Sequence, residues 1–281
     1  MKSQEKFVSP KSNYFVYSPS KSALKMFFYP LQCGYFIYDP GYCLRRESYD
    51  SYLLMYIQKG CLSLEFDGQT ISITAGQFVL LDCYQRHAYS TDSGYECLWC
   101  HFDGAVAQHW YTAIISHLGN VFSLLDPYPV LNRLTAIYDT FSSAGRVREP
   151  LMSKYLSDIL TSLLLYAPPK TTKYNYINMA EEIITYINEH FAEAITIEEL
   201  ARKAGLSQYH FIRTFKKETG FTPHEYIINT RISAAKYLLK NSHMSVKDIC
   251  FHSGFSCESV FCSAFKRHQG MTPEQYRTRD N

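Results

Sequence analysis

The 281-residue sequence has no uninterrupted apolar run of membrane-spanning length and no N-terminal apolar segment of the kind that directs secretion. It also lacks low-complexity tracts, and its net charge of +2 is too small to indicate a partner by itself. These absences argue against membrane, secreted and disordered proteins. We therefore expect a cytoplasmic globular protein, long enough for two domains with hydrophobic cores.

A disulfide framework is missing as well, because the nine Cys are odd in number and scattered along the chain. The close pair Cys97 and Cys100 lies in an apolar, strand-like run without the second pair that a zinc site needs, so buried thiols are the simpler interpretation. A cupin-type metal enzyme needs several converging histidines and a carboxylate. Since only His87 and the distant His101 are offered, we expect no metal, no cofactor and no enzymatic activity.

Residues 30–103 have the pattern of short strands, in which apolar runs alternate with polar residues and are broken by Gly, Asp and Pro. The clearest stretch is YLLMYIQKGCLSLEFDGQTISITAGQFVLLD, residues 52–82. Asp67-Gly68 marks a hairpin there, because both residue types tolerate a positive φ. Five or more strands at this spacing predict a β-sandwich or a small barrel.

Beyond residue 104 the apolar spacing becomes helical, first in residues 105–118, 130–143 and 150–166. The apolar stripe of the third segment is wide and leaves two interpretations open: core packing against the strands, or a seam that joins two copies of the chain. APPKTTKYNY, residues 167–176, then breaks the pattern and predicts a linker. The helical remainder is mildly basic, with 15 Lys and Arg against 12 Asp and Glu.

The C-terminal region contains a repeat. GLSQYHFIRTFKKETGFTPHEYI, residues 205–227, returns as GFSCESVFCSAFKRHQGMTPEQYR, residues 254–277, with Gly, a Phe-Lys pair and Thr-Pro in the same order. A short amphipathic helix precedes each copy and opens with a capping residue, Thr196 or Ser245. Two such units predict two helix-turn-helix motifs. The offset grows from 49 to 50 residues, which predicts one inserted residue in the second helix region of the second copy.

Residues 224–240 predict an amphipathic helix between the copies, roughly 25 Å long at 1.5 Å per residue. Such a strut suits two reading helices held about one turn of B-DNA apart, about 34 Å. A solvated face is the alternative interpretation for any single outward residue. The outward residues expected to contact DNA are Gln208, Tyr209, His210, Ile212, Arg213, Lys216 and Lys217 in the first unit, and Glu258, Ser259, Cys262, Ser263, Lys266 and Arg267 in the second.

Residues 177–279 resemble the AraC/XylS family of transcription regulators, through both half-motifs quoted above and their order. The resemblance implies base-facing positions at Tyr209, Ile212 and Arg213 in the first unit, and at Glu258, Ser259, Cys262 and Ser263 in the second. The chain departs from the family at Ser263, where members often carry Arg. We therefore expect the second unit to read sequence weakly and mainly to hold phosphates.

The N-terminal half is similar to the cupin-type sensor domain common in this family, through the stretch from residue 52 and through YECLWCHFDG, residues 95–104. The resemblance implies an effector such as a sugar, bound in the barrel under an N-terminal arm and near Arg45, His87, Tyr89 and Trp99. Arg hydrogen-bonds hydroxyls and Trp stacks on sugar rings, which suits this role. A packed core for Trp99 and a solvated loop for Arg45 are the alternatives.

The predicted fold class is α+β. Residues 1–166 form a cupin-like β-barrel with dimerisation helices, residues 167–176 a linker, and residues 177–281 an all-α DNA-binding domain with two helix-turn-helix units. The expected partners are double-stranded DNA, a small effector and a second copy of the chain, with RNA polymerase as a candidate. The alternative is an effector-independent regulator whose N-terminal half only dimerises or binds a protein. A hollow, polar barrel would favour the effector, and a barrel filled with Leu and Phe would not.

Overall fold

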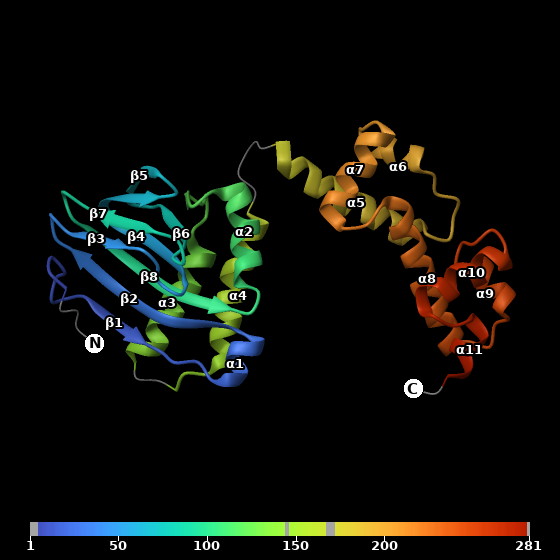
Figure 1. The fold of residues 1–281 in the computed structure, drawn as a ribbon, viewed down its shortest axis with the longest axis horizontal. Helices are drawn as coiled ribbons and strands as arrows, with labels where there is room; N and C mark the ends of the chain where they lie inside the picture. The colour runs from blue at the N-terminus through green and yellow to red at the C-terminus, as the bar shows by residue number, and fades with distance from the viewer. Residues whose placement is uncertain (1–4, 144–145, 167–171, 280–281) are drawn as a thin grey trace. The chain divides into compact units, whose positions relative to one another are not determined.

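The chain divides into two compact units, Met1–Pro168 and Pro169–Asn281 (Figure 1). The structure is a computed structural model and describes residues 5–143, 146–166 and 172–279. The first unit combines a sheet with helices and the second is built of helices, which confirms the predicted α+β fold. Of the predicted linker, residues 167–171 lie outside the described residues. Residues 172–176 belong instead to a helix that begins at Thr172, because they contain no Pro or Gly to interrupt it.

The strands of the first unit form two antiparallel layers that share one long strand, β4. One layer has the order β1-β2-β8-β4-β6-β9, and the second half of β4 pairs with β5 and β7, while β7 also pairs with β3. The strands are β1 Asn13–Val16, β2 Phe28–Tyr38, β3 Cys43–Arg46, β4 Tyr52–Phe66, β5 Gln69–Thr74, β6 Phe78–Asp82, β7 His87–Ser90, β8 Tyr95–Gly104 and β9 Val121–Phe122. Asp67 and Gly68 both have a positive φ, which confirms the predicted hairpin between β4 and β5.

Helices cover one face of the first layer (Figure 1). They are α1 Lys21–Met26, α2 Ala107–Leu118, α3 Tyr128–Ser142 and α4 Glu149–Leu165. Along β4, Leu54 packs toward these helices, whereas Leu53 and Met55 pack inside the barrel. Because both faces of the first part of β4, residues 52–57, are buried, its sequence there is a continuous apolar run instead of an alternation.

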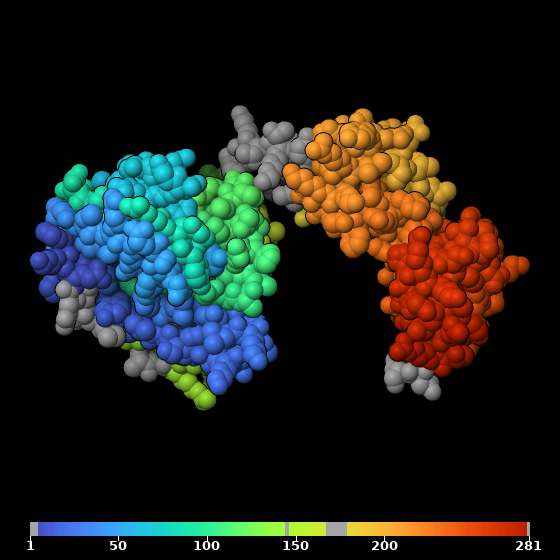
Figure 2. Space-filling view, in the orientation of Figure 1, coloured from blue at the N-terminus to red at the C-terminus, as the bar shows by residue number. Residues whose placement is uncertain are grey.

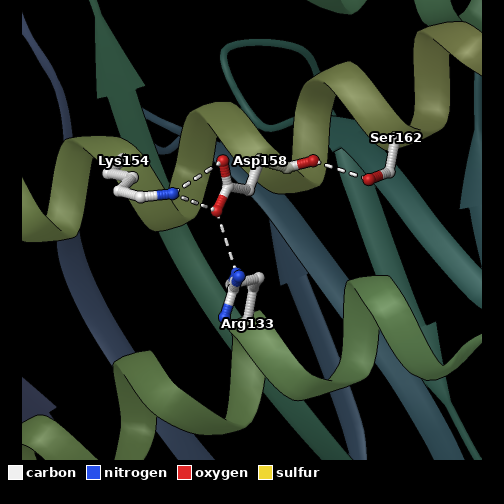
Figure 3. Close-up of polar contacts among 4 residues, drawn as sticks. All are labelled: Arg133, Lys154, Asp158 and Ser162. Carbon is white, nitrogen blue, oxygen red and sulfur yellow. Dashed lines mark hydrogen bonds and ion pairs between the residues drawn. The ribbon is translucent and has the colours of Figure 1, made fainter.

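The apolar stripe of α4, for which core packing or a seam between two copies was expected, packs largely in the core. Leu156, Leu160 and Leu163 are buried in the core between the sheet and the helices, so this side of the stripe is core packing. On another side of α4, the Asp158 carboxylate accepts hydrogen bonds from Arg133 Nε of α3 at 2.9 Å and from Lys154 Nζ at 3.0 Å (Figure 3). This partly exposed network joins α3 to α4, with a contribution of about 1 kcal/mol or less for each pair.

The second unit consists of two helix-turn-helix lobes joined by a shared helix, and the lobes adjoin in the space-filling view (Figure 2, orange and red). Its helices are α5 Thr172–His190, α6 Ile197–Lys203, α7 Gln208–Thr219, α8 Pro223–Asn241, α9 Val246–His252, α10 Glu258–Gln269 and α11 Pro273–Thr278. Ile227 of α8 packs in the first lobe's core, whereas Ile232 and Leu239 pack in the second lobe's core. Helix α8 is therefore the predicted strut, and both cores depend on it.

Polar caps set where these helices begin. Thr222 and Thr272 each form a complete capping box, with Pro at the next position, as the Thr-Pro pairs predict. Thr196 Oγ1 accepts from the backbone N–H of Glu199, but the Glu199 carboxylate accepts from Tyr186 Oη at 2.6 Å. The box predicted at Thr196 is therefore only half formed, because its carboxylate ties α6 to α5 instead.

The inserted residue of the second copy lies in the turn and not in the helix. Four residues separate α6 from α7 and five separate α9 from α10, whereas α7 and α10 are both 12 residues long. The residue at the N-cap position of the second helix is Ser207 in the first unit and Cys257 in the second, and only the Ser207 side chain makes a capping hydrogen bond. An extra residue inside a helix would rotate every later side chain by about 100°. A turn absorbs it, so the outward faces of α7 and α10 stay equivalent.

Close contacts join the two lobes beside α8. Arg231 donates to the carbonyl oxygens of Phe191 and Glu193, both at 2.8 Å, and its guanidinium faces the Phe255 ring at 5.9 Å. Gly254, in the turn of the second lobe, has φ of +81°. A Cβ atom there would lie 2.5 Å from the Phe191 carbonyl oxygen. Gly254 is therefore required both by its backbone conformation and by this close approach.

We predict that Gly254→Ala lowers the free energy of unfolding of the second unit by about 3 kcal/mol, since left-handed strain and the steric clash add together. Gly205→Ala is the matched control: it has φ of +65° but no atom within 4 Å of the added Cβ. We expect about 1 kcal/mol for it, from strain alone. Urea unfolding of the full chain, followed by circular dichroism, measures both. The two Trp residues lie in the first unit, so their fluorescence reports that unit separately. Equal losses would contradict the packing role of Gly254.

Candidate effector cavity and nucleic-acid interface

A cavity of about 440 Å³ opens inside the barrel of the first unit. Its volume lies within the usual range for small-molecule sites, about 300–1,000 Å³. Aromatic side chains dominate its wall, together with Gln32 and the charged side chains described below. The tyrosines that line it are Tyr14, Tyr38, Tyr42, Tyr89 and Tyr95. The strands of the barrel therefore enclose a cavity, and the cavity wall carries polar groups.

Trp99 reaches the cavity because β8 alternates between two cores. Trp99 lines the cavity, whereas the adjacent Cys100 packs toward the helices. The indole lies directly against Gly34 of the neighbouring strand, where a Cβ atom would be 2.6 Å from Trp99 Cζ2. Phe36 meets the indole edge-on with ring centroids 5.3 Å apart. Glycine at position 34 thus makes room for a flat aromatic wall.

His101 lies two residues farther along β8 and faces the same cavity. Its Nδ1 atom is hydrogen-bonded to Ser51 Oγ at 2.8 Å. Burial, with a smaller contribution from the nearby Arg46 charge, lowers the pKa of His101 to about 3. His101 is therefore uncharged near neutral pH. No group of three or more His, Cys, Asp and Glu that could hold a metal ion occurs among the described residues.

Two buried polar atoms of the cavity wall have no hydrogen-bond partner within the described parts of the chain: Tyr89 Oη and Trp99 Nε1. The Cys83 thiol lies near the Tyr89 hydroxyl, but thiols hydrogen-bond only weakly. A buried polar group without a partner costs about 1–3 kcal/mol. Both atoms belong to residues that line the cavity, so a bound ligand could satisfy them.

The side chains of the two adjacent arginines of β3, Arg45 and Arg46, lie on opposite faces of the strand. Arg45 is 54% exposed and its Nη2 atom lies 2.8 Å from Glu65 Oε2, outside the cavity. Arg46 lines the cavity, and its guanidinium carbon lies 4.7 Å above the centroid of the Tyr49 ring. Leu44 lines the cavity too, so the period of two along β3 places Arg46 on the inner face and Arg45 on the outer one. Sequence reasoning missed Arg46, although this alternation from Leu44 would have found it.

His87 is buried in the wall of a neighbouring hollow that Arg45 also lines, and it does not line the main cavity. Its Nδ1–H donates to the Gln85 carbonyl at 2.8 Å, and burial lowers its pKa. Its Nε2 atom has no partner within the described ranges. Of the four expected effector residues, the structure brings Tyr89 and Trp99 into the cavity but places Arg45 and His87 beside the neighbouring hollow.

An N-terminal segment, residues 5–20, runs along the barrel edge and reaches the cavity. Val8 forms an isolated bridge with Tyr38, and β1 continues the pairing with β2. Glu5 lines the cavity and accepts a hydrogen bond from Tyr42 Oη at 3.2 Å. At the other end, the Ser20 hydroxyl donates to the Glu149 carboxylate of α4 at 2.7 Å. The segment therefore touches both the cavity and the start of α4.

The second unit presents the expected DNA-facing residues on α7 and α10. All seven on α7 are exposed, with Tyr209 at 78%, while Phe211 and Phe215 fill the core behind them. On α10 the six expected residues are exposed except Cys262, which is half-buried. Arg213 makes no ion pair with any described residue. Its position on α10 is held by Ser263, so the two faces differ in charge.

Comparisons with known proteins address both units. Residues 29–160 match the model of an AraC-like ligand binding domain, and residues 200–279 match that of a helix-turn-helix domain. The Msm operon regulatory protein of Streptococcus mutans serotype c is 25% identical over 253 residues, which cover 85% of this chain and 88% of that protein. The lactose operon transcription activator of Staphylococcus xylosus is 23% identical over 260 residues, 88% of this chain and 90% of that protein. The DNA-binding domain of AdpA in complex with a target DNA is 32% identical, with a TM-score of 0.34, and covers 35% of this chain and 88% of that chain.

We predict that His101 makes the first unit less stable as the pH falls below about 6.5. The unfolded chain then binds a proton that the folded chain, with a pKa of about 3, does not bind. The free energy of unfolding is therefore highest above the pKa that His101 has in the unfolded chain, and it declines by about 2 kcal/mol between pH 7 and pH 5. Urea unfolding followed by Trp fluorescence measures this slope. In the His101→Asn variant the slope should be smaller by this amount, and an unchanged slope would contradict the buried, neutral state.

Proposed function

The chain belongs to the AraC family of transcription regulators, and we propose that it binds a small effector in the barrel cavity to control how its two helix-turn-helix units engage DNA. The observation that carries this proposal is the hollow barrel, whose wall contains buried polar atoms without partners. A barrel that served only dimerisation would have no reason to keep them, because each one lowers stability. The cavity thus favours an effector over the effector-independent alternative.

We propose a sugar as the class of effector. Trp99 and the tyrosines of the wall combine ring faces for stacking with hydroxyls for hydrogen bonding, which suits a ring that has apolar faces and polar edges. The name of the Staphylococcus xylosus relative, a lactose operon activator, supports this class. A thermal-shift screen of the full chain against mono- and oligosaccharides tests it, since a ligand raises stability by RT ln(1 + [L]/Kd). Absence of any shift across the screen would refute the sugar.

The two units are proposed to read DNA unequally. Arg213 carries a bidentate donor suited to a guanine edge, whereas Ser263 at the equivalent position is short and neutral. Glu258 opens α10 with a negative charge, which disfavours the approach of phosphates there. Lys216, Lys217 and their equivalents on α10 lie in the last turns and supply phosphate contacts. The first unit then carries most of the specificity.

We further propose that the regulator acts in the cytoplasm as a homodimer and contacts RNA polymerase as an activator. No helix in the described residues is long and apolar enough to cross a membrane. Large apolar side chains near the helices α3 and α4 remain exposed, including Leu125 at 83% and Leu165 at 72%, and these offer a surface for a second copy. Sedimentation equilibrium of the full chain tests the dimer, and a monomer at micromolar concentration would refute it.

Replacing Arg213 by Ala should weaken binding to the preferred DNA by about 1–3 kcal/mol, since a bidentate base contact is lost. The test is titration of DNA selected from a random library, and of unrelated DNA, at two salt concentrations. Lys217→Ala is the comparison: it should weaken binding to both DNAs alike and reduce the salt slope by about 1. Ser263→Ala should change little. If Arg213→Ala also weakened both DNAs alike, Arg213 would be a phosphate contact.

The variant Tyr89→Phe removes only a hydroxyl that has no partner in the described residues. We expect the free energy of unfolding to stay constant or to rise by about 1 kcal/mol, while effector affinity falls by about 10-fold. The matched control is Tyr111→Phe, because Tyr111 Oη accepts from Asn120 Nδ2 at 2.8 Å. That variant should lose about 1 kcal/mol of stability and keep its effector affinity. Calorimetric titration with an effector found in the screen, together with urea unfolding, measures both quantities.

A further inference from the structure

The cavity wall contains one cation and one carboxylate, Arg46 and Glu5, which come from different segments. Arg46 is its cation and makes no ion pair with a carboxylate of the described residues. His101 contributes no charge near neutral pH. Glu5 is the carboxylate that lines the cavity, but it belongs to the N-terminal segment and accepts from the Tyr42 hydroxyl. The guanidinium therefore lies at the cavity wall without a carboxylate partner among the described residues.

The position of Arg46 leaves its hydrogen-bonding edge available. Its guanidinium stacks over the Tyr49 ring, and stacking occupies the face of the planar group while its N–H donors lie in the plane. The Trp99 Nε1–H is a second donor of the wall without a partner, and Trp offers no acceptor. The Tyr89 hydroxyl also lacks a partner. The unsatisfied groups are thus mainly donors, and they require a ligand that is rich in acceptors.

We propose that the effector carries a carboxylate, which the Arg46 guanidinium binds through paired hydrogen bonds, so that the ligand is a sugar acid and not a neutral sugar. A carboxylate accepts about four hydrogen bonds and matches the fork of a guanidinium. A phosphate would bring about two negative charges to a wall with one cation. This inference rests on the proposed function of the cavity and specifies its ligand.

Glu5 provides a second, independent test of whether the ligand is charged. If the ligand is an anion, the Glu5 carboxylate at the same cavity repels it, and removing that charge strengthens binding. If the ligand is a neutral sugar, Glu5 is an acceptor for a sugar hydroxyl, and its removal weakens binding. The variant Glu5→Gln keeps the size of the side chain and changes its charge. Its effect on affinity therefore distinguishes the two ligand classes by direction.

The first experiment titrates the full chain with matched pairs of probes by calorimetry: galacturonate against galactose, glucuronate against glucose, and 4-hydroxybenzoate against 4-hydroxybenzamide. We expect an acid to bind at least 10-fold more tightly than its neutral partner, because charge-assisted hydrogen bonds exceed neutral ones. A preference within the sugar pairs supports the sugar acid. A preference confined to the aromatic pair overturns the sugar acid while it retains the carboxylate site. Equal binding of acid and neutral partners overturns the inference but leaves the effector cavity intact.

The second experiment repeats the titrations with variants of the adjacent arginines. Arg46→Gln should remove the preference for the acid, with a loss of about 10- to 100-fold in its affinity and little change for the neutral partner. Arg45→Gln is the matched control, since Arg45 pairs with Glu65 outside the cavity, and it should bind as the parent does. Glu5→Gln should bind the acid more tightly. If Arg45→Gln caused the larger loss, the assignment to Arg46 would be wrong, and if no probe bound at millimolar concentration, the proposed cavity function would fail as well.

Discussion

The first unit depends on one constraint: the first part of β4, residues 52–57, and most of β8 are buried on both faces, so consecutive residues enter two different cores. Leu54 and Cys100 pack beneath the helices, whereas Leu53 and Trp99 lie on the cavity side. A slip of one residue would exchange the two sets completely. The register that builds the helix-covered core therefore also fixes the cavity wall. For the same reason, the helix-covered core and the cavity lie on opposite sides of one sheet and are not independent parts.

The second unit depends in the same way on α8, which belongs to both helix-turn-helix cores at once. Arg231 and Gly254 add a close contact between the lobes, and the extra residue of the second copy is confined to its turn. The backbone and core of each helix-turn-helix unit are therefore repeated, whereas the exposed side chains of α7 and α10 differ between the two units. The unequal reading proposed for the two units would follow from the chemistry of their exposed residues and would need no difference in their geometry.

Much of this structure could be predicted from the sequence, because the repeat, the Thr-Pro caps and the Asp-Gly hairpin are local signals with local causes. The cavity was harder to predict. Arg45 and Arg46 are adjacent and chemically identical, and they can be told apart only once residues 43–46 are known to form a strand, whose alternation places Arg46 on the same face as Leu44. The partner of Glu199 was missed because it depends on Tyr186, a contact between helices that no spacing rule reports. The location of the insertion also stayed hidden, since a shift in offset does not say where along the motif it occurs.

If the proposed effector binds in the cavity, the unsatisfied groups of the wall would link its binding to regulation. Each one lowers the stability of the empty protein, so a ligand that satisfies it regains that free energy on binding. Such a gain changes DNA binding only if two states of the protein bind the ligand differently. The N-terminal segment has the contacts to distinguish two states, since Glu5 lies at the cavity while Ser20 holds Glu149 at the start of α4. An anion and a neutral sugar interact with Glu5 with opposite signs, and they would therefore drive this segment in opposite directions. The charge of the effector would therefore determine whether its binding holds the N-terminal segment at the cavity or displaces it.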